Sequence, residues 1–567
     1  MSANDVVVSG ISGRFPLSDN TDQLAKNLYD KVDMVTGDDT RWPVDLYDMN
    51  PRMGKIMDFN KFDSTFFGLM EQMMNEVDPQ ARMLLEVVYE AIADAGVNPQ
   101  DLRGGRTGVY VGVSIYANTQ GYPEDIQPDI RNNLQAAVLN SMSNTKTFYA
   151  SRISFVFDLK GPSMIVDTAC SASNVDSAVV CGTHMLFEPF VLQFQQEGGL
   201  CSQRGVAAVL DQEADGFIKG EAVCCNFLQY RKNARRVYAT VLAAKMNIDG
   251  FKTIGMFFPS AEAQEELMTE AYKEAGVDPL DLTFFEAHCT GTKAGDPQEI
   301  KAIYNAYCKG PGRETPLPLG VLKSNMGHSE AGSGTAAIIK VCIAYENECI
   351  PPNLNMTQIK DECAVYCPPL EPIMESLPYE PGLAGINNFG IGGANAHVLL
   401  EPNYKLGTND SLKIAQTIPR IVNICGRTER SVKHIMDFIE NNPKKITNDF
   451  LALLAQTMRF KPNVNSSGFP YKGSLIIKKI SEENNEIKYE YKKQTGVMKG
   501  KTLRQLWLLF PGLGGQWPAM AKALMPIKIF ADKVEECHQI LQEFGIDLKN
   551  LLLSEDKTTI STMTAKF

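Results

Sequence analysis

Cys170 is the residue of this sequence whose surroundings best suit nucleophilic chemistry. It follows an apolar segment that ends at Val166, and a tight turn of small residues separates the two. A strand that runs into such a turn is typical of a nucleophile elbow. If a helix opens at the cysteine, the positive end of that helix lowers the thiol pKa and raises the thiolate fraction. Because the chain has thirteen cysteines, a buried structural thiol is the alternative interpretation.

Two of the six histidines, His288 and His328, lie where predicted strands end in loops of small residues. His288 stands in FEAHCTGTKAGDPQE at 285–299, and His328 stands in VLKSNMGHSEAGSG at 321–334. A single histidine in such a place is more often a hydrogen-bonded polar residue than a catalyst. Two of them, together with an elbow cysteine, favour a site where imidazoles act beside a thiolate.

The elements that must position these residues alternate between strand and helix as far as about Pro402. Residues 6–8 are predicted to form the first strand, and residues 107–113 a buried strand. Residues 78–95 have helical spacing, with one apolar face formed by Met83, Leu84, Val87, Val88 and Ile92. This alternation predicts a mixed α/β core.

The composition limits the class of protein. Hydrophobic residues make up 44% and charged residues 22% of 567, which is a globular balance. No apolar run is long enough to predict a membrane span, and the N-terminus does not have the pattern of a secretory signal. We therefore expect a cytoplasmic protein. A net charge of -12 argues against nucleic acid as the main partner.

The cysteines are scattered through the chain and are expected to be reduced thiols. Cys363 and Cys367 form a CxxxC pair, and Cys181 and His184 form a CxxH pair. Neither pair has the second pair of ligands that a structural zinc site needs. No metal site is predicted.

Six motifs, in order, resemble those of β-ketoacyl synthases. Three surround the candidate residues: DTACSAS at 167–173, EAHCTGTKAGDPQE at 286–299 and KSNMGHSEAG at 323–332. The supporting motifs are VDPQAR at 77–82, SRISF at 151–155 and GINNFGIGGANAH at 385–397. The resemblance covers about residues 5–402 and favours the ketosynthase that begins animal-type fatty acid synthases. Polyketide synthases share the three central motifs and stay an alternative.

The resemblance implies a thiolase-like fold, in which two similar α/β halves form a five-layered core, usually as a homodimer. It implies that Cys170 takes an acyl group from a thioester on an acyl-carrier protein or domain. Malonyl on a phosphopantetheine arm would then enter the site. The implied ligands are therefore malonyl and acyl thioesters carried on phosphopantetheine, with no cofactor bound covalently to this chain.

The resemblance also implies residue roles. His288 and His328 would donate hydrogen bonds to the malonyl thioester carbonyl as CO2 leaves. The backbone amides of Cys170 and Ile391 would form the oxyanion hole. Lys323 and Glu330 would be a paired support that positions His328, with a plain structural ion pair as the alternative. The residues implied to bind substrate or the pantetheine arm are Thr290, Thr292 and Phe389.

Four departures from the family pattern bear on activity. Cys289 replaces a glycine, Ala172 replaces a serine, and Ile391 replaces the second aromatic of a Phe-Gly-Phe motif that would gate the acyl pocket. The largest departure follows Cys170, where only residues 171–181 precede Gly182. Eleven residues make about three helical turns, too few for the family's long buried helix and the strand after it. The sequence therefore predicts a shortened or lost core helix behind the nucleophile.

Composition shifts after Pro402, and we predict three domains: a β-ketoacyl synthase domain at 1–402, a small α/β linker domain at 403–504, and the N-terminal fragment of an acyltransferase at 505–567. The fragment is identified from FPGLGGQW at 510–517, which resembles the opening of a malonyl/acetyltransferase. Residues 506–510 are expected to be its first strand. Gln516 is a candidate oxyanion residue, but no GxSxG nucleophile motif follows.

Three hypotheses follow from these motifs. The chain is a condensing enzyme of fatty acid biosynthesis, or the ketosynthase of a polyketide synthase. Alternatively, it is a catalytically impaired ketosynthase-like fragment that acts only in dimerisation or binding. The intact Cys170, His288 and His328 favour an enzyme, whereas the short segment after Cys170 favours the impaired fragment.

Overall fold

The computed structural model describes most of the chain and divides it into two units. One unit comprises residues 1–407 with 460–466, and the other comprises 408–459 with 467–567. The described residues are 2–44, 49–75, 77–113, 145–166, 177–309, 313–404, 410–416, 418–457, 469–483, 486–497, 507 and 517–558. Cys170 therefore lies outside the described residues.

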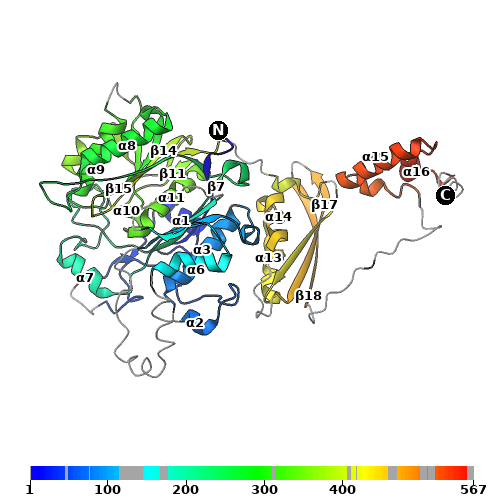
Figure 1. Ribbon diagram of the computed structural model, residues 1–567, viewed down its shortest axis with the longest axis horizontal. Helices are drawn as coiled ribbons and strands as arrows, with labels where there is room; N and C mark the ends of the chain where they lie inside the picture. Colours follow the sequence, from blue (N-terminus) through cyan, green and yellow to red (C-terminus); the bar gives the residue numbers. More distant parts are fainter. Residues whose placement is uncertain are drawn as a thin grey trace. The chain divides into compact units, whose positions relative to one another are not determined.

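A mixed sheet forms the centre of the first unit (Figure 1). Its N-terminal strands are β1 (Val6–Arg14), β4 (Thr107–Val113), β5 (Ser163–Ile165), β6 (Ser177–His184) and β7 (Ala222–Tyr230). Its C-terminal strands are β8 (Ala239–Ile248), β9 (Leu282–Glu286), β10 (Leu317–Gly320), β12 (Leu370–Pro372), β14 (Leu383–Phe389) and β15 (Ala394–Pro402). Among the described residues these eleven strands lie in the order β12-β10-β9-β14-β15-β8-β1-β7-β6-β4-β5. The predicted strands at 6–8 and 107–113 are both present.

The two halves of the sheet repeat one topology. In chain order the first half is β1, β4, β5, β6, β7, and the second is β8, β9, β10, β14, β15. Each half arranges its first, fifth, fourth, second and third strands side by side in that order. The first two neighbouring pairs are antiparallel and the last two are parallel in both halves. The halves join where β1 pairs with β8.

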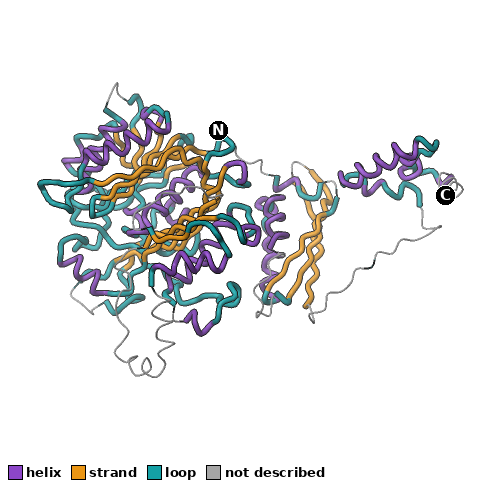
Figure 2. Tube along the Cα trace, viewed as in Figure 1, coloured by secondary structure: helices purple, strands orange, loops and turns teal. Residues whose placement is uncertain are grey.

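Helices cover the outer faces of both halves and fill the space between them (Figures 1 and 2). On the first half, α3 (Pro79–Asp94) and α6 (Thr147–Phe157) share one apolar core with β4, β6 and β7. On the second half, α8 (Ala261–Ala275) and α9 (Gly295–Tyr307) share another with β9 and β10. Between the halves, α11 (Ser333–Asn347) contacts β6 and β7 as well as β14. The result is the expected five layers.

Helix α3 shows how the sequence sets these layers. The Asp78 side chain caps it by accepting a hydrogen bond from the Gln80 amide at 2.8 Å, and Pro79 occupies its first turn. All five residues of the predicted apolar face are buried, as expected from the spacing: Met83, Leu84, Val87, Val88 and Ile92. The capping residue and the apolar spacing together fix where α3 begins and which face meets the sheet.

The connection from β5 to β6 is much shorter than its counterpart in the second half. Between β10 and β14 the chain has residues 321–382, which include α11. Between β5 and β6 it has only residues 166–176. Because β6 begins at Ser177, six residues, 171–176, follow Cys170 before the strand. A six-residue helix would be about 9 Å long, whereas α11 has 15 residues. The whole connection is thus shorter than α11 alone. Residues 167–176 lie outside the described residues, so the loss of the helix stays a prediction.

Smaller elements complete the first unit. The strands are β2 (Val35–Thr36) with β3 (Met53–Gly54), and β11 (Cys349–Ile350) with β13 (Leu377–Pro378). The helices are α1 (Thr21–Tyr29), α2 (Glu71–Asn75), α7 (Pro189–Glu197), α10 (Lys323–Met326) and α12 (Asp361–Ala364). The 3-10 turns are η1 (Pro99–Leu102), η3 (Arg231–Asn233), η4 (Pro279–Asp281) and η5 (Glu330–Gly332). Of these, α10 and η5 flank His328 directly.

The second unit has its own sheet and core. Strands β16 (Arg420–Gly426), β17 (Tyr471–Glu483) and β18 (Glu486–Val497) form an antiparallel sheet. Helices α13 (Glu429–Asn441) and α14 (Asn448–Thr457) pack on it around Val432, Met436 and Leu475. The 3-10 turns here are η6 (Ser411–Lys413) and η7 (Pro443–Lys445). This is a small α/β arrangement of the kind expected of the linker.

Two helices follow near the C-terminus, α15 (Lys528–Gln542) and α16 (Leu548–Leu553), after the 3-10 turn η8 (Lys522–Leu524). The predicted strand at 506–510 lies, apart from Trp507, outside the described residues, and so does Gln516. A search of the described part of the chain finds no helix with the length and apolar character needed to cross a membrane.

Candidate functional site

The imidazoles of His288 and His328 lie side by side. Their ring centroids are 5.4 Å apart and the ring planes are perpendicular, at 90°. The two residues follow β9 and β10, which are parallel neighbours paired at Leu319 and Phe285. Parallel neighbours end at the same edge of a sheet, so the loops after them meet. The fold thus brings together the two histidines that the sequence singled out.

The loop at His288 is held by the buried carboxylate of Glu299, on α9. One Glu299 oxygen accepts hydrogen bonds from the His288 amide at 2.8 Å and from the Asn387 side chain at 3.0 Å. The other oxygen accepts one from the Cys289 amide at 2.7 Å. Two of these donors are the consecutive backbone amides of His288 and Cys289, so the carboxylate fixes the peptide groups before and after His288. Glu299 thereby fixes the backbone position from which the His288 side chain extends.

The loop at His328 is held by the segment that precedes β7. The His328 amide donates to the Ile218 carbonyl at 2.6 Å, and the Gly220 amide donates to the His328 carbonyl at 2.9 Å. Gly327 has a φ of +80°, a conformation that disfavours a side chain, so the turn into His328 requires glycine. Two backbone hydrogen bonds and one obligatory glycine therefore define the path of this loop.

Each imidazole has a polar neighbour at its Nδ1 atom. Ser333, at the start of α11, places its hydroxyl 2.9 Å from His328 Nδ1. When that hydroxyl donates, the His328 proton sits on Nε2, which can then donate to a substrate oxygen. The Asn388 side chain places its oxygen Oδ1 3.1 Å from His288 Nδ1, and since an amide oxygen only accepts, this orientation puts the His288 proton on Nδ1. Rotating the carboxamide by 180° would bring its NH2 group to Nδ1 and the proton to Nε2, the tautomer given above for His328.

Both imidazoles are neutral in this environment. Burial and the nearby Lys323 ammonium hold the pKa of His288 well below its usual value. Burial comes first for His328 as well, and the neighbouring groups His288, Lys323, Lys219 and His184 lower its pKa further. A neutral imidazole can donate a hydrogen bond to an enolate oxygen, although it carries no positive charge before the enolate forms. The pair is therefore suited to stabilise charge that develops on an oxygen during reaction.

Glu330, which the sequence paired with Lys323, has Lys219 as an ion-pair partner in the structure. The carboxylate of Glu330 forms an ion pair with Lys219 and lies 3.5 Å from His184 Nδ1. The physical reason is the backbone: Glu330 has a φ of +41°, and the Lys219 segment runs parallel to His328. Lys323 instead lies buried where the charges of Glu299 and Glu286 act on it.

The remaining predicted residues line the same loops. Thr290 follows His288, and its hydroxyl donates to that of Thr292 at 3.3 Å. Asp296 holds this loop through the Thr290 and Gly291 amides. The Phe389 ring lies 5.7 Å from that of His288. Ile391 is 60% exposed in the turn between β14 and β15. Its proposed oxyanion partner, the amide of Cys170, lies outside the described residues.

Three family models match consecutive parts of the chain. They are the Beta-ketoacyl synthase N-terminal domain at residues 3–234, the Beta-ketoacyl synthase C-terminal domain at 238–357 and the Ketoacyl-synthetase C-terminal extension at 364–476. A fatty acid synthase sequence from the goose Anser anser anser is 39% identical over 357 residues, which are 60% of this chain and 99% of that sequence. The chain belongs to the β-ketoacyl synthase family.

Other relatives of this ketosynthase come from polyketide assembly. The hybrid PKS-NRPS synthetase pynA of Aspergillus niger is 31% identical over 99% of this chain, and the chain spans only 15% of its length. The oxazolomycin ketosynthase domain OzmH KS7 of Streptomyces albus superposes with a TM-score of 0.72 at 26% identity, covering 83% of this chain and 85% of that one. The ketosynthase from module 6 of the bacillaene synthase of Bacillus subtilis gives 0.70 at 27% identity, covering 83% and 82%. These structures confirm the thiolase-like ketosynthase fold.

The sequence interpretation missed the residues that hold the ketosynthase histidines. Glu299 was within reach, because it ends the motif that contains His288. Asn388 and Ser333 were not assigned roles, since no local spacing connects Asn388 with His288. Their contacts form only when β14 lies beside β9 and α11 begins beneath His328. The supporting residues are a product of the tertiary fold.

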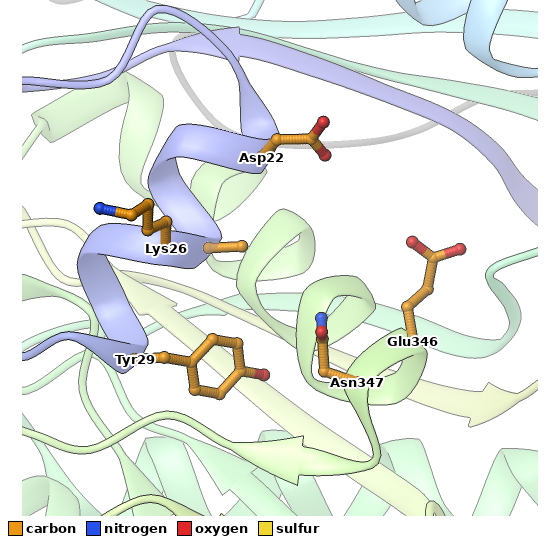
Figure 3. Close-up of a pocket in the computed structure, with 6 residues that line it drawn as sticks. Asp22, Lys26, Tyr29, Glu346 and Asn347 are labelled. Atoms are coloured by element: carbon orange, nitrogen blue, oxygen red, sulfur yellow. The ribbon is translucent and has the colours of Figure 1, made fainter. Parts of the chain in front are cut away.

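A separate pocket opens between α1 and the C-terminal end of α11 (Figure 3). Its volume is about 580 Å³, and its lining is Asp22, Ala25, Lys26, Tyr29, Glu346 and Asn347. None of the predicted site residues lines it. Within the described residues, no group of histidine, cysteine and carboxylate side chains is arranged to hold a metal ion.

Proposed function

We propose that this chain catalyses the decarboxylative condensation of fatty acid biosynthesis, as a β-ketoacyl-[acyl-carrier-protein] synthase. The observation that carries the proposal is the pair of neutral, perpendicular imidazoles of His288 and His328, 5.4 Å apart. Their positions support a common substrate oxygen as the target of both rings. Membership of the β-ketoacyl synthase family supports the reaction class.

The first proposed step is acyl capture. The Cys170 thiolate attacks the carbonyl carbon of an acyl thioester, a new C–S bond forms, and the carrier thiol leaves. In the second step a malonyl thioester loses its carboxylate as CO2. The electron pair of the broken C–C bond moves into an enolate, whose oxygen accepts hydrogen bonds from His288 and His328. The family's motifs and the imidazole geometry support these assignments.

The last proposed step forms the product. The enolate carbon attacks the acyl thioester on Cys170, a C–C bond forms, and the Cys170 thiolate leaves. The amides of Cys170 and Ile391 are assigned to the oxyanion of this step. Thr290 and Thr292 are assigned to the phosphopantetheine arm, and Phe389 to the wall of the acyl site. Their placement on the loops beside His288 supports these roles.

The proposed setting is a homodimer working with an acyl-carrier protein or domain in the cytoplasm. We propose a ketosynthase domain at 1–402, a linker at 403–504 and the start of an acyltransferase at 505–567. The separate core of the second unit supports a boundary near residue 407. The chain spans 15% of the length of the hybrid PKS-NRPS synthetase pynA, so the proposal concerns the condensation step alone.

A second candidate function is that of a chain impaired in acyl capture. The observation that favours it is the eleven-residue connection between β5 and β6, which is shorter than the 15 residues of α11 alone. A nucleophile needs support that holds it within about half an ångström. In this reading the chain binds partners or decarboxylates malonyl without condensing it.

One pair of assays separates the two candidates. Acyl capture is measured by labelling the chain with a radioactive acyl thioester, comparing wild type with Cys170→Ala and with the control Cys349→Ala. Decarboxylation is measured as CO2 release from a malonyl thioester, comparing His328→Ala with His434→Ala, an exposed histidine of the second unit. Condensation is supported if Cys170→Ala loses acyl labelling and His328→Ala loses decarboxylation while both control variants behave as wild type. Decarboxylation without acyl labelling supports the impaired chain, and equal labelling of wild type and Cys170→Ala contradicts the nucleophile.

The choice between fatty acid and polyketide substrates needs its own test. Fatty acid elongation requires capture of fully reduced acyl chains, which lack polar groups at the β-carbon. We expect saturated acyl thioesters to label Cys170 faster than β-hydroxyacyl thioesters of equal length. The goose relative supports this expectation, whereas the fungal relatives support the polyketide alternative. Equal labelling rates would favour a polyketide substrate.

A further inference from the structure

A buried charged cluster lies directly behind His328. Lys219 and His184 are fully buried, and both approach the carboxylate of Glu330. The Lys219 ammonium forms the ion pair, while His184 Nδ1 lies 3.5 Å from the second carboxylate oxygen. Neither ring nitrogen of His184 has a hydrogen-bond partner within the described residues. The proposed reaction uses neither Lys219 nor His184.

Lys219 reaches His328 by two physical routes. Its backbone neighbours, Ile218 and Gly220, make the two hydrogen bonds that flank the His328 peptide, at 2.6 and 2.9 Å. Its ammonium lies 5.4 Å from the centroid of the Phe217 ring, within range of a cation–π contact. That ring meets the His328 imidazole edge-on at 5.6 Å. A change at Lys219 is therefore expected to affect both the 218–220 backbone and the Phe217 ring, which contact His328.

The turn after His328 is packed so tightly that a second backbone conformation would cost free energy. A Cβ atom built on Gly182, in β6, would lie 2.6 Å from the Ala331 carbonyl oxygen. Glu330 itself adopts a φ of +41°, which is unfavourable for a residue with a side chain. The ion pair with Lys219 compensates for that conformation. His184, also in β6, faces the same carboxylate, so Glu330 connects this strand with the His328 turn.

We propose that Lys219 and His184 are positioning residues for His328, acting through Glu330 and Phe217. This inference rests on the proposed function, because it concerns the imidazole assigned to malonyl decarboxylation. The Lys219–Glu330 pair fixes the turn, and His184 holds the same carboxylate from β6. β6 is the strand that follows Cys170 in the chain. The cluster therefore connects that strand with the turn that carries His328.

The test uses the full chain and the variants Lys219→Met, Lys219→Arg and His184→Asn. Lys301→Met serves as a matched control, because Lys301 pairs with Glu262 on the exposed face of α9 and α8. Two readouts do not depend on activity. Amide hydrogen exchange of peptides covering 324–333 reports the order of the turn, and exchange at the imidazole carbon between the ring nitrogens gives the pKa of His328. The third readout is kcat and KM for malonyl-thioester decarboxylation.

We expect Lys219→Met to speed amide exchange at least tenfold in 324–333 and to lower kcat about 10- to 100-fold with little change in KM. The pKa of His328 should rise, because a positive charge is lost while Glu330 keeps its negative one. Burial lowers the pKa of His328 most, and the neighbouring groups that lower it further are His288, Lys323, Lys219 and His184. Lys219→Arg should restore most of each readout. His184→Asn should change exchange and kcat in the same direction, but less.

Unchanged exchange and an unchanged His328 pKa in Lys219→Met would overturn the proposal whatever the activity. If Lys219→Met unfolds, Lys219→Arg and His184→Asn decide, and wild-type behaviour in His184→Asn would remove His184 from the assignment. The two hypotheses fail differently. An inactive wild-type chain whose variants still loosen 324–333 contradicts the proposed function and leaves the positioning role intact.

Discussion

Replacing Glu299 with glutamine tests how His288 is held. The carboxylate accepts three hydrogen bonds, two at one oxygen and one at the other. A glutamine offers one oxygen and one NH2 group. In its better orientation the oxygen keeps the His288 and Asn387 donors, and the NH2 group faces the Cys289 amide. One buried amide is then left without an acceptor.

The magnitude follows from that count. An unpaired buried donor costs about 1–3 kcal/mol, and the two retained bonds lose the strengthening that a charged acceptor gives. Burial raises the pKa of the Glu299 carboxyl, so removing the charge recovers part of the desolvation cost. We expect Glu299→Gln to lower the free energy of unfolding by about 2 kcal/mol. A shift of His288 of about 1 Å would lower decarboxylation about 100-fold.

The assay is CO2 release from a malonyl thioester, together with urea unfolding of the full chain. Glu262→Gln is the matched control, because its carboxylate is 74% exposed in the pair with Lys301. Exposed pairs contribute about 0–1 kcal/mol, so the control should behave as wild type. Decarboxylation within threefold of wild type in Glu299→Gln, at unchanged stability, would refute the argument that Glu299 holds His288.

Three further outcomes follow from the same geometry. Asn388→Asp removes the NH2 group that a rotated carboxamide can turn to His288 Nδ1, keeps the proton on Nδ1 so that Nε2 cannot donate, and should lower the decarboxylation kcat about 100-fold. Lys340→Met removes the ammonium that lies 2.7 Å from the buried Glu286 carboxylate and leaves that charge with the Leu322 amide, at 2.6 Å, as a donor; urea unfolding should show a loss of about 3–5 kcal/mol, largely recovered by adding Glu286→Leu. Stability should fall as pH drops below about 6.5, because the unfolded chain then binds protons that the folded chain does not, at up to about 1.4 kcal/mol per pH unit per histidine. Urea titrations between pH 7.5 and 5 check this, and a slope unchanged by His397→Gln would contradict it; the histidines with lowered pKa are His184, His288, His328 and His397.

What could be predicted from the sequence was what local spacing encodes. The strand at 107–113 and the capped helix at 78–95 follow from short-range patterns, and both are present. The meeting of His288 and His328 was expected from two loop motifs alone. Each of these depends on residues close together in the chain, where propensity and periodicity act.

The supporting contacts could not be predicted in the same way. Glu330 looked like the partner of Lys323 because both lie in one motif, yet its ion pair is with Lys219. That contact joins positions 111 residues apart and depends on a backbone turn at positive φ. Asn388 reaches His288 across a parallel pair of strands. Charge partners in a buried site are chosen by tertiary geometry, which no motif spacing encodes.

The repeated topology of the two halves allows the surroundings of His328, assigned to decarboxylation, to be compared with those of Cys170, assigned to acyl capture. His328 follows β10, the third strand of its half, and α11 begins immediately beyond it. Cys170 follows β5, the third strand of the other half, where the equivalent connection has eleven residues, fewer than α11 alone. The half that carries both histidines thus retains its central helix, with Ser333 at its start touching His328. The chain should therefore keep malonyl decarboxylation more readily than acyl capture, because the histidines assigned to decarboxylation lie in the half that contains α11, whereas acyl capture needs Cys170.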